Sequence, residues 1–260
     1  MVRELGTVVG LDIVRITSAK PLLDAKKRVP DSGMNRSDGY RADSGRFWNP
    51  QSALAGAKSA IVVAECYQTS ETGEKSKPGN PVGKIANYTW RNYYKDVSVK
   101  LTKIAAALKK ETGCRNFKTC CGVLAEKALA ERAGVGWYGK NSIIQTEKFG
   151  SRVVLGEIVT SLALEPDSPL EKNCGGCKKC VEACPTGALS APYVLDRKKC
   201  LQHLTNWYGI FPENVRKIWG DRLYGCTSAR MPVRTIRKRT LWNGCPTMAL
   251  SVQLCRFYQY

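Results

Sequence analysis

The chain reads Cys174-Gly-Gly-Cys177-Lys-Lys-Cys180-Val-Glu-Ala-Cys184-Pro185 in its C-terminal half. Three cysteines at intervals of three residues, followed by a fourth before proline, are typical of a ferredoxin module with two [4Fe–4S] clusters. In such a module the first three thiolates bind one cluster and the Cys-Pro cysteine binds the other. Zinc is the alternative metal, but zinc knuckles use two separated cysteine pairs and not a run that ends in Cys-Pro. The motif therefore predicts iron–sulfur clusters.

Two such clusters take eight cysteines. Cys174, Cys177 and Cys180 are assigned to one cluster. Cys184 is assigned to the other, with Cys200 and Cys226 as further candidates. A second Cys-x-x-Cys-x-x-x-Cys-Pro run is expected from Cys226 onward, but the chain continues Thr-Ser-Ala-Arg-Met-Pro. One ligand of each cluster is therefore missing from this assignment.

A nucleotide lost near Thr227 would account for the missing cysteines. One permitted choice of codons for residues 228–236, read from the last base of the Ser228 codon, encodes Cys-Gln-Asp-Ala-Cys-Pro-Tyr-Asn. We therefore expect residues 228–260 to be an anomalous basic tail, out of frame and not selected to pack. The alternative is a naturally divergent tail in which Cys245 or Cys255 supplies a ligand.

Charge and cysteine content limit the class of protein. Lys and Arg outnumber Asp and Glu by 41 to 22, which gives a net charge of +19. Such a field attracts polyanions such as nucleic acid, although a solvated basic surface is the alternative. No apolar run approaches the roughly 20 residues of a membrane span, and Asp12 and Arg15 interrupt the one stretch that resembles a signal peptide. We expect a cytoplasmic protein whose twelve cysteines are ligands or redox groups and not disulfides.

The first 165 residues mix strand and helix patterns. The apolar, β-branched residues 59–67 predict a buried strand, and the spacing of apolar residues over 97–110 predicts a helix that stops at Gly113. A second helix is expected over 123–132, and one or two strands interrupted at Gly156 are expected over 151–164. Polar segments predict loops over 30–50 and 69–83.

This order of segments predicts an α+β chain. We expect a mixed α/β N-terminal domain over residues 1–165, a small ferredoxin-like two-cluster module over 166–227, and the basic tail over 228–260.

Stretches outside the cysteine motif are similar to epoxyqueuosine reductases. The first runs from Leu129 to Asn141 and holds Gly134-Val-Gly136-Trp137-Tyr-Gly139-Lys140-Asn141, and the second is Phe149-Gly-Ser-Arg-Val-Val-Leu-Gly-Glu-Ile158. The segments 50–67 and 85–88 and the isolated Cys200-Leu-x-x-Leu-Thr205 fit the same family. The resemblance covers roughly residues 45–227.

The resemblance implies a cobalamin-dependent reductase that converts the epoxide of epoxyqueuosine in tRNA to the alkene of queuosine. Its N-terminal domain would bind the corrinoid, its two [4Fe–4S] clusters would pass single electrons, and an external low-potential donor would supply them. The residues implied at the cobalamin are Tyr88, Gly134, Gly136, Trp137, Gly139, Lys140 and Asn141. Taken alone, a Gly-x-Gly-x-x-Gly run is a weak signal, and a helix-to-strand turn or a nucleotide loop is the alternative.

One position departs from the family. Cys120 stands six residues before Glu126, where the family has an aspartate thought to donate a proton. A thiol can donate a proton or approach the cobalt, and Cys120 is therefore the candidate catalytic residue; a small buried side chain is the alternative. Two other functions fit the sequence: a cobalamin-free electron-transfer protein with two clusters, and a truncated product without function.

Overall fold

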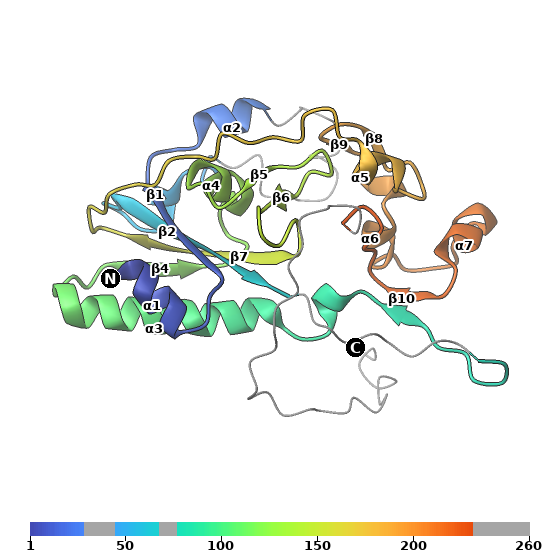
Figure 1. The fold of residues 1–260 in the computed structure, drawn as a ribbon, viewed down its shortest axis with the longest axis horizontal. Helices are drawn as coiled ribbons and strands as arrows, with labels where there is room; N and C mark the ends of the chain where they lie inside the picture. The colour runs from blue at the N-terminus through green and yellow to red at the C-terminus, as the bar shows by residue number, and fades with distance from the viewer. Residues whose placement is uncertain (29–44, 68–76, 231–260) are drawn as a thin grey trace.

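The computed structural model describes residues 1–28, 45–67 and 77–230. At its centre is an antiparallel sheet in the order β1-β2-β7-β4, shown in Figure 1. The strands are β1 (Ile13–Ser18), β2 (Ser59–Cys66), β7 (Val153–Thr160) and β4 (Phe117–Cys120). Every residue of the two central strands, β2 and β7, is buried. Both faces of the sheet are therefore covered.

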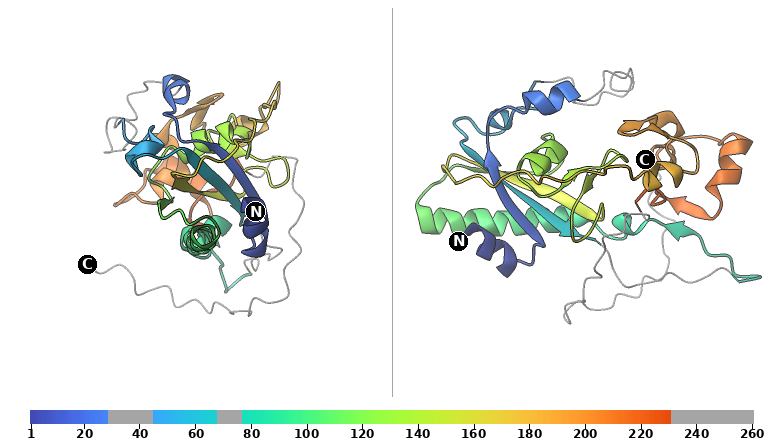
Figure 2. Two further views of the ribbon diagram at one scale, coloured as in Figure 1. Left: turned by 90° about the vertical axis from the view of Figure 1, so that its left-hand side faces the viewer. Right: turned by 45° about the horizontal axis from the view of Figure 1, so that its top comes forward.

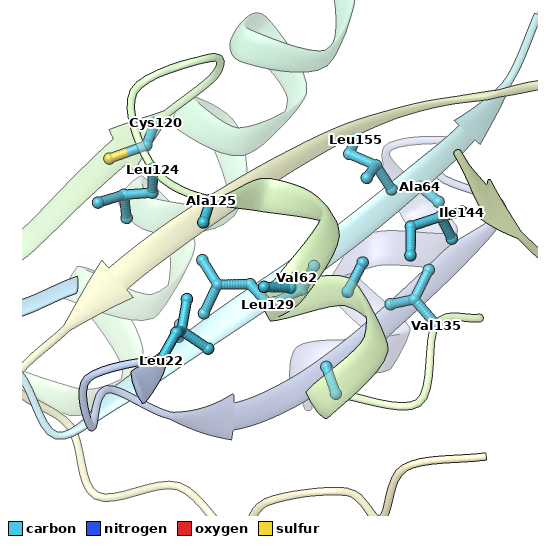
Figure 3. Packing of buried hydrophobic residues seen from close by; sticks show 14 of the residues in the cluster. Leu22, Val62, Ala64, Cys120, Leu124, Ala125, Leu129, Val135, Ile144 and Leu155 are labelled. Atoms are coloured by element: carbon cyan, nitrogen blue, oxygen red, sulfur yellow. The ribbon is translucent and has the colours of Figure 1, made fainter. Parts of the chain in front are cut away.

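Alternate residues of β2 and β7 lie in two separate hydrophobic cores, one on each face of the sheet. Ile61 and Ile158 point to the face covered by α3 (Tyr93–Thr112) and α1 (Val2–Val8). Val62 and Leu155 point to the opposite face, where α4 (Glu126–Arg132) packs, as Figure 3 shows. Figure 2 shows α3 end-on beneath the sheet. This division follows from the two-residue repeat of a strand.

The helix α3 is longer than its apolar pattern predicts. The side chain of Asn92 caps its first turn by accepting a hydrogen bond from the Lys95 amide at 3.0 Å. Gly113 ends it in the left-handed region at φ 69°, as expected. The strand expected over 59–67 is confirmed as β2. The helix expected over 123–132 begins three residues later, because residues 121–124 form a bend through which Leu124 and Ala125 enter the core.

The interruption expected at Gly156 is wrong, because β7 passes through this residue unbroken. A Cβ atom at Gly156 would lie 2.7 Å from Cγ1 of Val97 and 3.1 Å from Cδ1 of Leu101. The missing side chain therefore lets α3 pack closely on the sheet and does not end the strand.

The segment that follows β7 still packs on the sheet, because the Asp167 amide donates to the Ile16 carbonyl oxygen of β1 at 2.9 Å. Residues 173–230 form a smaller region of short elements beside the sheet (Figure 1). It contains α5 (Lys179–Glu182), the hairpin of β8 (Leu189–Ala191) and β9 (Val194–Leu195), the 3-10 helix η5 (Arg197–Lys199), α6 (Leu201–Leu204), α7 (Glu213–Trp219) and β10 (Arg222–Tyr224). The last of these pairs in parallel with β3 (Lys84–Ile85). The end of the region is therefore tied to the earlier part of the chain.

The remaining elements are short. They are α2 (Leu23–Arg28), the 3-10 helices η3 (Pro50–Ser52) and η4 (Asn87–Thr89), and the hairpin of β5 (Trp137–Tyr138) and β6 (Ile144–Gln145). Most of the two loops expected over 30–50 and 69–83, and the tail after residue 230, lie outside the described residues. Within the described part, no helix is long and apolar enough to cross a membrane.

Candidate functional site

Three cysteines of the main motif lie close together at the start of α5. The Cys177 amide donates to the Cys174 carbonyl oxygen at 2.9 Å, which folds the loop back on itself. Burial raises the pKa of Cys180, and the negative charges of Cys174 and Cys177 raise it further. The spacing of these cysteines predicts that they bind one face of a [4Fe–4S] cluster, although among the described residues no three Cys, His, Asp or Glu side chains surround a common point.

Cys184 lies in a different environment. Burial acts to raise the pKa of its thiol, but hydrogen bonds from the backbone amides of Leu189, Thr186 and Ala188 and from the Thr186 hydroxyl outweigh burial and lower the pKa. Amides directed at a sulfur favour the thiolate, which is the form that binds iron. The hydrogen bonds to Cys184 therefore favour its thiolate, and its assignment to another cluster stays a prediction.

The two remaining candidate ligands lie at the ends of short elements. Cys200 is the N-cap of α6, and Cys226 directly follows Gly225 after β10. Cys245 and Cys255, the alternative ligands, lie beyond the described part of the chain.

A buried lysine joins the glycine-rich loop to the first cysteine motif. Lys140 donates from Nζ to the carbonyl oxygen of Gly175 at 2.5 Å, between Cys174 and Cys177 in the sequence. The carbonyl oxygen of Lys140 accepts from the Tyr193 amide at 3.0 Å, and the Ser142 hydroxyl donates to the Tyr193 carbonyl oxygen at 3.1 Å. The loop after β5 is therefore fixed against the cysteine-rich region.

The three glycines of this loop are required by close packing within the protein. Gly134 follows α4 with φ +72°, and a Cβ atom there would lie 2.2 Å from the Ser168 carbonyl oxygen. At Gly136 the same atom would lie 2.2 Å from the Gln145 carbonyl oxygen, and at Gly139 it would lie 2.5 Å from Nε2 of that glutamine. These contacts explain the glycines as a helix-to-strand turn. Their contact with a cofactor stays a prediction.

The polar side chains of the loop divide into two groups. Asn141 accepts from Nε2 of Gln145 at 2.9 Å and donates to the Ala229 carbonyl oxygen at 3.0 Å, so it is held by protein partners, as Lys140 is. By contrast, Nε1 of Trp137 and Oε1 of Gln145 are buried and have no hydrogen-bond partner within the described residues. These two atoms are the ones in the loop that a bound cofactor would satisfy.

Tyr88 lies between the sheet domain and the end of the cysteine-rich region. Its hydroxyl donates to Oε1 of Gln202 and accepts from the Cys226 amide at 3.2 Å. Burial raises the pKa of Tyr88 to about 12. The Arg230 guanidinium lies 4.8 Å from the centre of the Tyr88 ring and donates to the Tyr67 hydroxyl at 2.7 Å. Sequence reasoning did not identify Tyr67 or Arg230, because no motif marks them.

The side chain of Cys120 is 3 % exposed and packs against Leu124, as Figure 3 shows. Burial raises the pKa of this thiol to about 12, and the charge of Glu157 adds to the effect. Cys120 is therefore a neutral thiol near pH 7. This burial agrees with the alternative of a small core side chain, and the proton-donor role stays a prediction.

Two acidic residues that sequence reasoning did not assign lie next to Cys120. Glu157 is fully buried on β7, and neither carboxyl oxygen has a hydrogen-bond partner within the described residues. Burial raises its pKa well above the ordinary value, and the charge of Glu126 raises it further. Glu126 accepts from the Gly122 amide, and burial raises its pKa to about 7. A glutamate within the apolar run 153–160 was the signal in the sequence.

Comparison with protein families gives two matches within the chain. Residues 173–228 match the family described as 4Fe-4S double cluster binding domain. Residues 48–121 match the family described as epoxyqueuosine reductase QueG, DUF1730. The first match contains all six assigned cluster cysteines, and the second contains Tyr88 and Cys120.

Individual proteins agree with these matches. Epoxyqueuosine reductase of Bacillus cereus is 38 % identical over 228 residues, which are 85 % of this chain and 60 % of that protein. A crystal structure of selenomethionine-labelled epoxyqueuosine reductase superimposes with a TM-score of 0.81 at 32 % identity, over 90 % of this chain and 64 % of that one. A structure of epoxyqueuosine reductase with an epoxyqueuosine-modified tRNA-Tyr stem loop gives a TM-score of 0.78 at 30 % identity, with the same coverage. The chain spans about 60 % of the length of the curated relatives it matches.

Proposed function

Because this chain belongs to the epoxyqueuosine reductase family, we propose that it is an iron–sulfur oxidoreductase that reduces the epoxide of epoxyqueuosine in tRNA to the alkene of queuosine. Removal of the epoxide oxygen as water consumes two electrons and two protons. Clusters bound by the six cysteines would pass the electrons one at a time, and an external low-potential donor would supply them. The proposed partner is tRNA, and the proposed location is the cytoplasm.

The contact between Lys140 and Gly175 is the observation that supports this function best. It holds the loop of the sheet domain against the segment between two cluster ligands. A cluster on Cys174, Cys177 and Cys180 would therefore lie beside the sheet domain, where electrons can pass from it to a bound substrate or cofactor. A chain that served only to carry electrons to a distant partner would not need this attachment.

We propose cobalamin as the further cofactor on the strength of the family resemblance. Bound cobalamin supplies a cobalt nucleophile that no side chain can provide. The buried Nε1 of Trp137 and Oε1 of Gln145 support a ligand at the glycine-rich loop, because within the described residues neither has a partner. Lys140 and Asn141 are bonded to Gly175 and Ala229 in this structure, and their proposed role is to fix the loop.

Cys120 is the proposed proton donor. Its pKa of about 12 makes the thiol a weak acid, but an alkoxide released by opening of the epoxide is a stronger base than a thiolate. Proton transfer from Cys120 to such an oxygen is therefore downhill. Glu126, with a pKa of about 7, lies nearby and would return a proton to the site.

We further propose that the two clusters are complete only when the reading frame is restored near Thr227. The assigned cysteines give each cluster three ligands, so each has one open iron. The proposed domains are residues 1–165 for the cofactor and substrate, residues 166–227 for the clusters, and residues 228–260 as the out-of-frame tail.

The test is anaerobic reconstitution of the chain with iron, sulfide and cobalamin, beside a frame-corrected chain. Conversion of epoxyqueuosine to queuosine in tRNA is followed by mass spectrometry of the digested nucleosides with a chemical reductant present. We expect the frame-corrected chain to bind cobalamin, as seen in the visible spectrum, and to convert the nucleoside. Full cluster loading without corrinoid binding or conversion would favour an electron-transfer protein instead.

A further inference from the structure

The segment Trp207-Tyr208-Gly209-Ile210-Phe211, between α6 and α7, presents large apolar side chains to solvent. Trp207 is 61 % exposed, Tyr208 is 98 % exposed and Ile210 is 93 % exposed. Single exposed apolar residues are common on proteins, but adjoining ones indicate a binding surface. We call residues 207–211, together with Trp219 beneath them, the aromatic platform.

The platform has an ordered base. The ring of Phe211 stacks on that of Trp219 with centroids 4.6 Å apart, and Trp207 meets Phe211 edge-on at 6.4 Å. The indole Nε1 of Trp219 donates to the Arg222 carbonyl oxygen at 2.5 Å. Gly209 has φ +122°, a conformation that side chains rarely allow, and its neighbours Tyr208 and Ile210 are both almost fully exposed. The rings of Trp207, Phe211 and Trp219 are therefore in contact before any partner arrives, and Tyr208 and Ile210 extend from this base into solvent.

Hydrogen bonds also tie the platform to β10. The Tyr224 hydroxyl donates to Oδ1 of Asn206 at 3.1 Å, directly before Trp207. The Arg222 guanidinium donates to the carbonyl oxygens of Ile218 and Trp219 at 3.0 and 2.7 Å, which closes the end of α7. A surface fixed at both ends loses little conformational entropy on binding.

The surroundings of the platform are basic. Between residues 196 and 224 the chain has three acidic residues, Asp196, Glu213 and Asp221, and six basic ones, Arg197, Lys198, Lys199, Arg216, Lys217 and Arg222. Two of the lysines form ion pairs, Lys199 with Asp196 and Lys217 with Glu213, and an excess of positive charge remains. Proteins that bind single-stranded nucleic acid combine such positive charge, which attracts phosphates, with aromatic rings on which bases stack. Single-stranded RNA loops, whose bases are free of pairing, are recognised in this way.

We propose that the aromatic platform is a stacking surface for the unpaired bases of an RNA loop, with Trp207 and Tyr208 as the stacking residues. This inference rests on the proposed function and deepens it, since the substrate nucleoside lies in a tRNA and the platform would hold bases of the loop that contains it. The basic residues of η5 and α7 would then contact the phosphates. A protein partner on the same surface is the competing occupant.

The first experiment measures binding of the full chain to a fluorescently labelled RNA hairpin with the sequence of an anticodon stem-loop, by fluorescence anisotropy. We expect W207A/Y208A to weaken binding about tenfold or more, because each stacked base contributes substantially to affinity. The salt dependence should stay as in the wild type, since no charge is removed. W207F/Y208F should restore binding, because it keeps both rings.

A matched control is Tyr94→Ala, which removes a ring that is 56 % exposed on α3, far from the platform in the sequence. It should leave the affinity unchanged. Circular dichroism of each variant checks that the chain is folded.

The second experiment repeats the titrations with a hairpin whose loop nucleotides are abasic. The affinity of the wild type for this abasic hairpin should fall by about the same factor as the affinity of W207A/Y208A falls for the intact hairpin. The double variant should bind the two hairpins with equal affinity. Equal affinity of W207A/Y208A and the wild type for the intact hairpin would overturn the inference and favour a protein partner. If the wild type bound no hairpin, the result would contradict both tRNA as the partner in the proposed function and the platform as an RNA-binding surface. RNA binding through the platform without epoxide reduction would leave the inference intact and contradict the proposed function.

Discussion

Cys120 and Glu157 lie directly opposite each other on β4 and β7, with both side chains buried. The charges that act on Glu157 come from another acid, Glu126, and both burial and this repulsion favour the neutral carboxyl. Burial therefore raises the pKa of both groups, the Cys120 thiol and the Glu157 carboxyl, above their ordinary values.

Removal of the Cys120 thiol tests its role. In the frame-corrected chain, Cys120→Ala should lower the single-turnover rate of epoxide reduction about a hundredfold, because general acids typically contribute that much or more. The variant should lose only about 1 kcal/mol of stability, since one sulfur atom leaves a small cavity. Cys66→Ala is the matched control, because Cys66 is also buried in the same core. An unchanged rate in Cys120→Ala would make Glu126 the next candidate.

The stability of the chain should depend on the protonation of Glu126. Its folded pKa of about 7 lies above the ordinary value of 4.5, so its contribution to stability is complete below about pH 4.5 and is lost as the pH rises through about 7. We expect Glu126→Gln to flatten the fall in the free energy of unfolding over this range, measured by urea titration at several pH values. Exposed Glu213 serves as the control, through Glu213→Gln. A profile that Glu126→Gln leaves unchanged would show that the carboxyl titrates normally.

Iron content tests the ligand assignment. The frame-corrected chain should bind about eight irons after anaerobic reconstitution, because each cubane holds four. Cys200→Ala should leave about four irons, and the chain with residues 228–260 as written should lose its iron in air faster than the corrected one. Four irons in the corrected chain, with no loss in Cys200→Ala, would contradict the second cluster.

The attachment of the glycine-rich loop can be broken at Lys140. Lys140→Met keeps most of the side-chain volume but removes the donor to the Gly175 carbonyl oxygen, which should cost about 1 to 3 kcal/mol. We expect a lower melting temperature and faster loss of the first cluster, followed by its absorbance. Lys198→Met, at an exposed lysine of η5, should change neither quantity. Equal cluster lifetimes in the two variants would show that the contact of Lys140 does not stabilise the cluster.

Binding of tRNA should depend steeply on salt. The chain without its tail carries a net charge of +13, and each neutralised phosphate lowers the slope of log K against log salt by roughly 0.9 in duplex RNA. Titrations at several salt concentrations would give the number of contacts. Affinity that is flat between low and moderate salt would show that this charge is only a solvated surface.

Patterns local in sequence predicted the fold well. The buried run of β2 and the spacing in α3 depend on neighbouring residues, so both were visible without coordinates. Gly156 was misread because its role depends on Val97 and Leu101, which approach it only when α3 packs on the sheet. A glycine that makes room and a glycine that breaks a strand look alike in the sequence.

The candidate site also has a part that is visible from local sequence and a part that depends on the fold. The four motif cysteines lie within eleven residues, so the cluster domain could be predicted from the sequence, and a family match covers these residues. The neighbourhood of Cys120 could not, because Glu157 reaches it through the register of β4 on β7. Likewise, Tyr67 and Arg230 meet only because the end of the cysteine-rich region returns to the sheet domain.

The parallel pairing of β3 with β10 also bears on how the chain assembles during synthesis. All four strands of the central sheet lie before residue 161, so they leave the ribosome before the cysteine motif does. Lys84 and Ile85 must wait for Arg222 and Tyr224, and closing so long a loop is slow. The cysteines of the motif therefore emerge beside strands that are already made, before β10 can pair with β3.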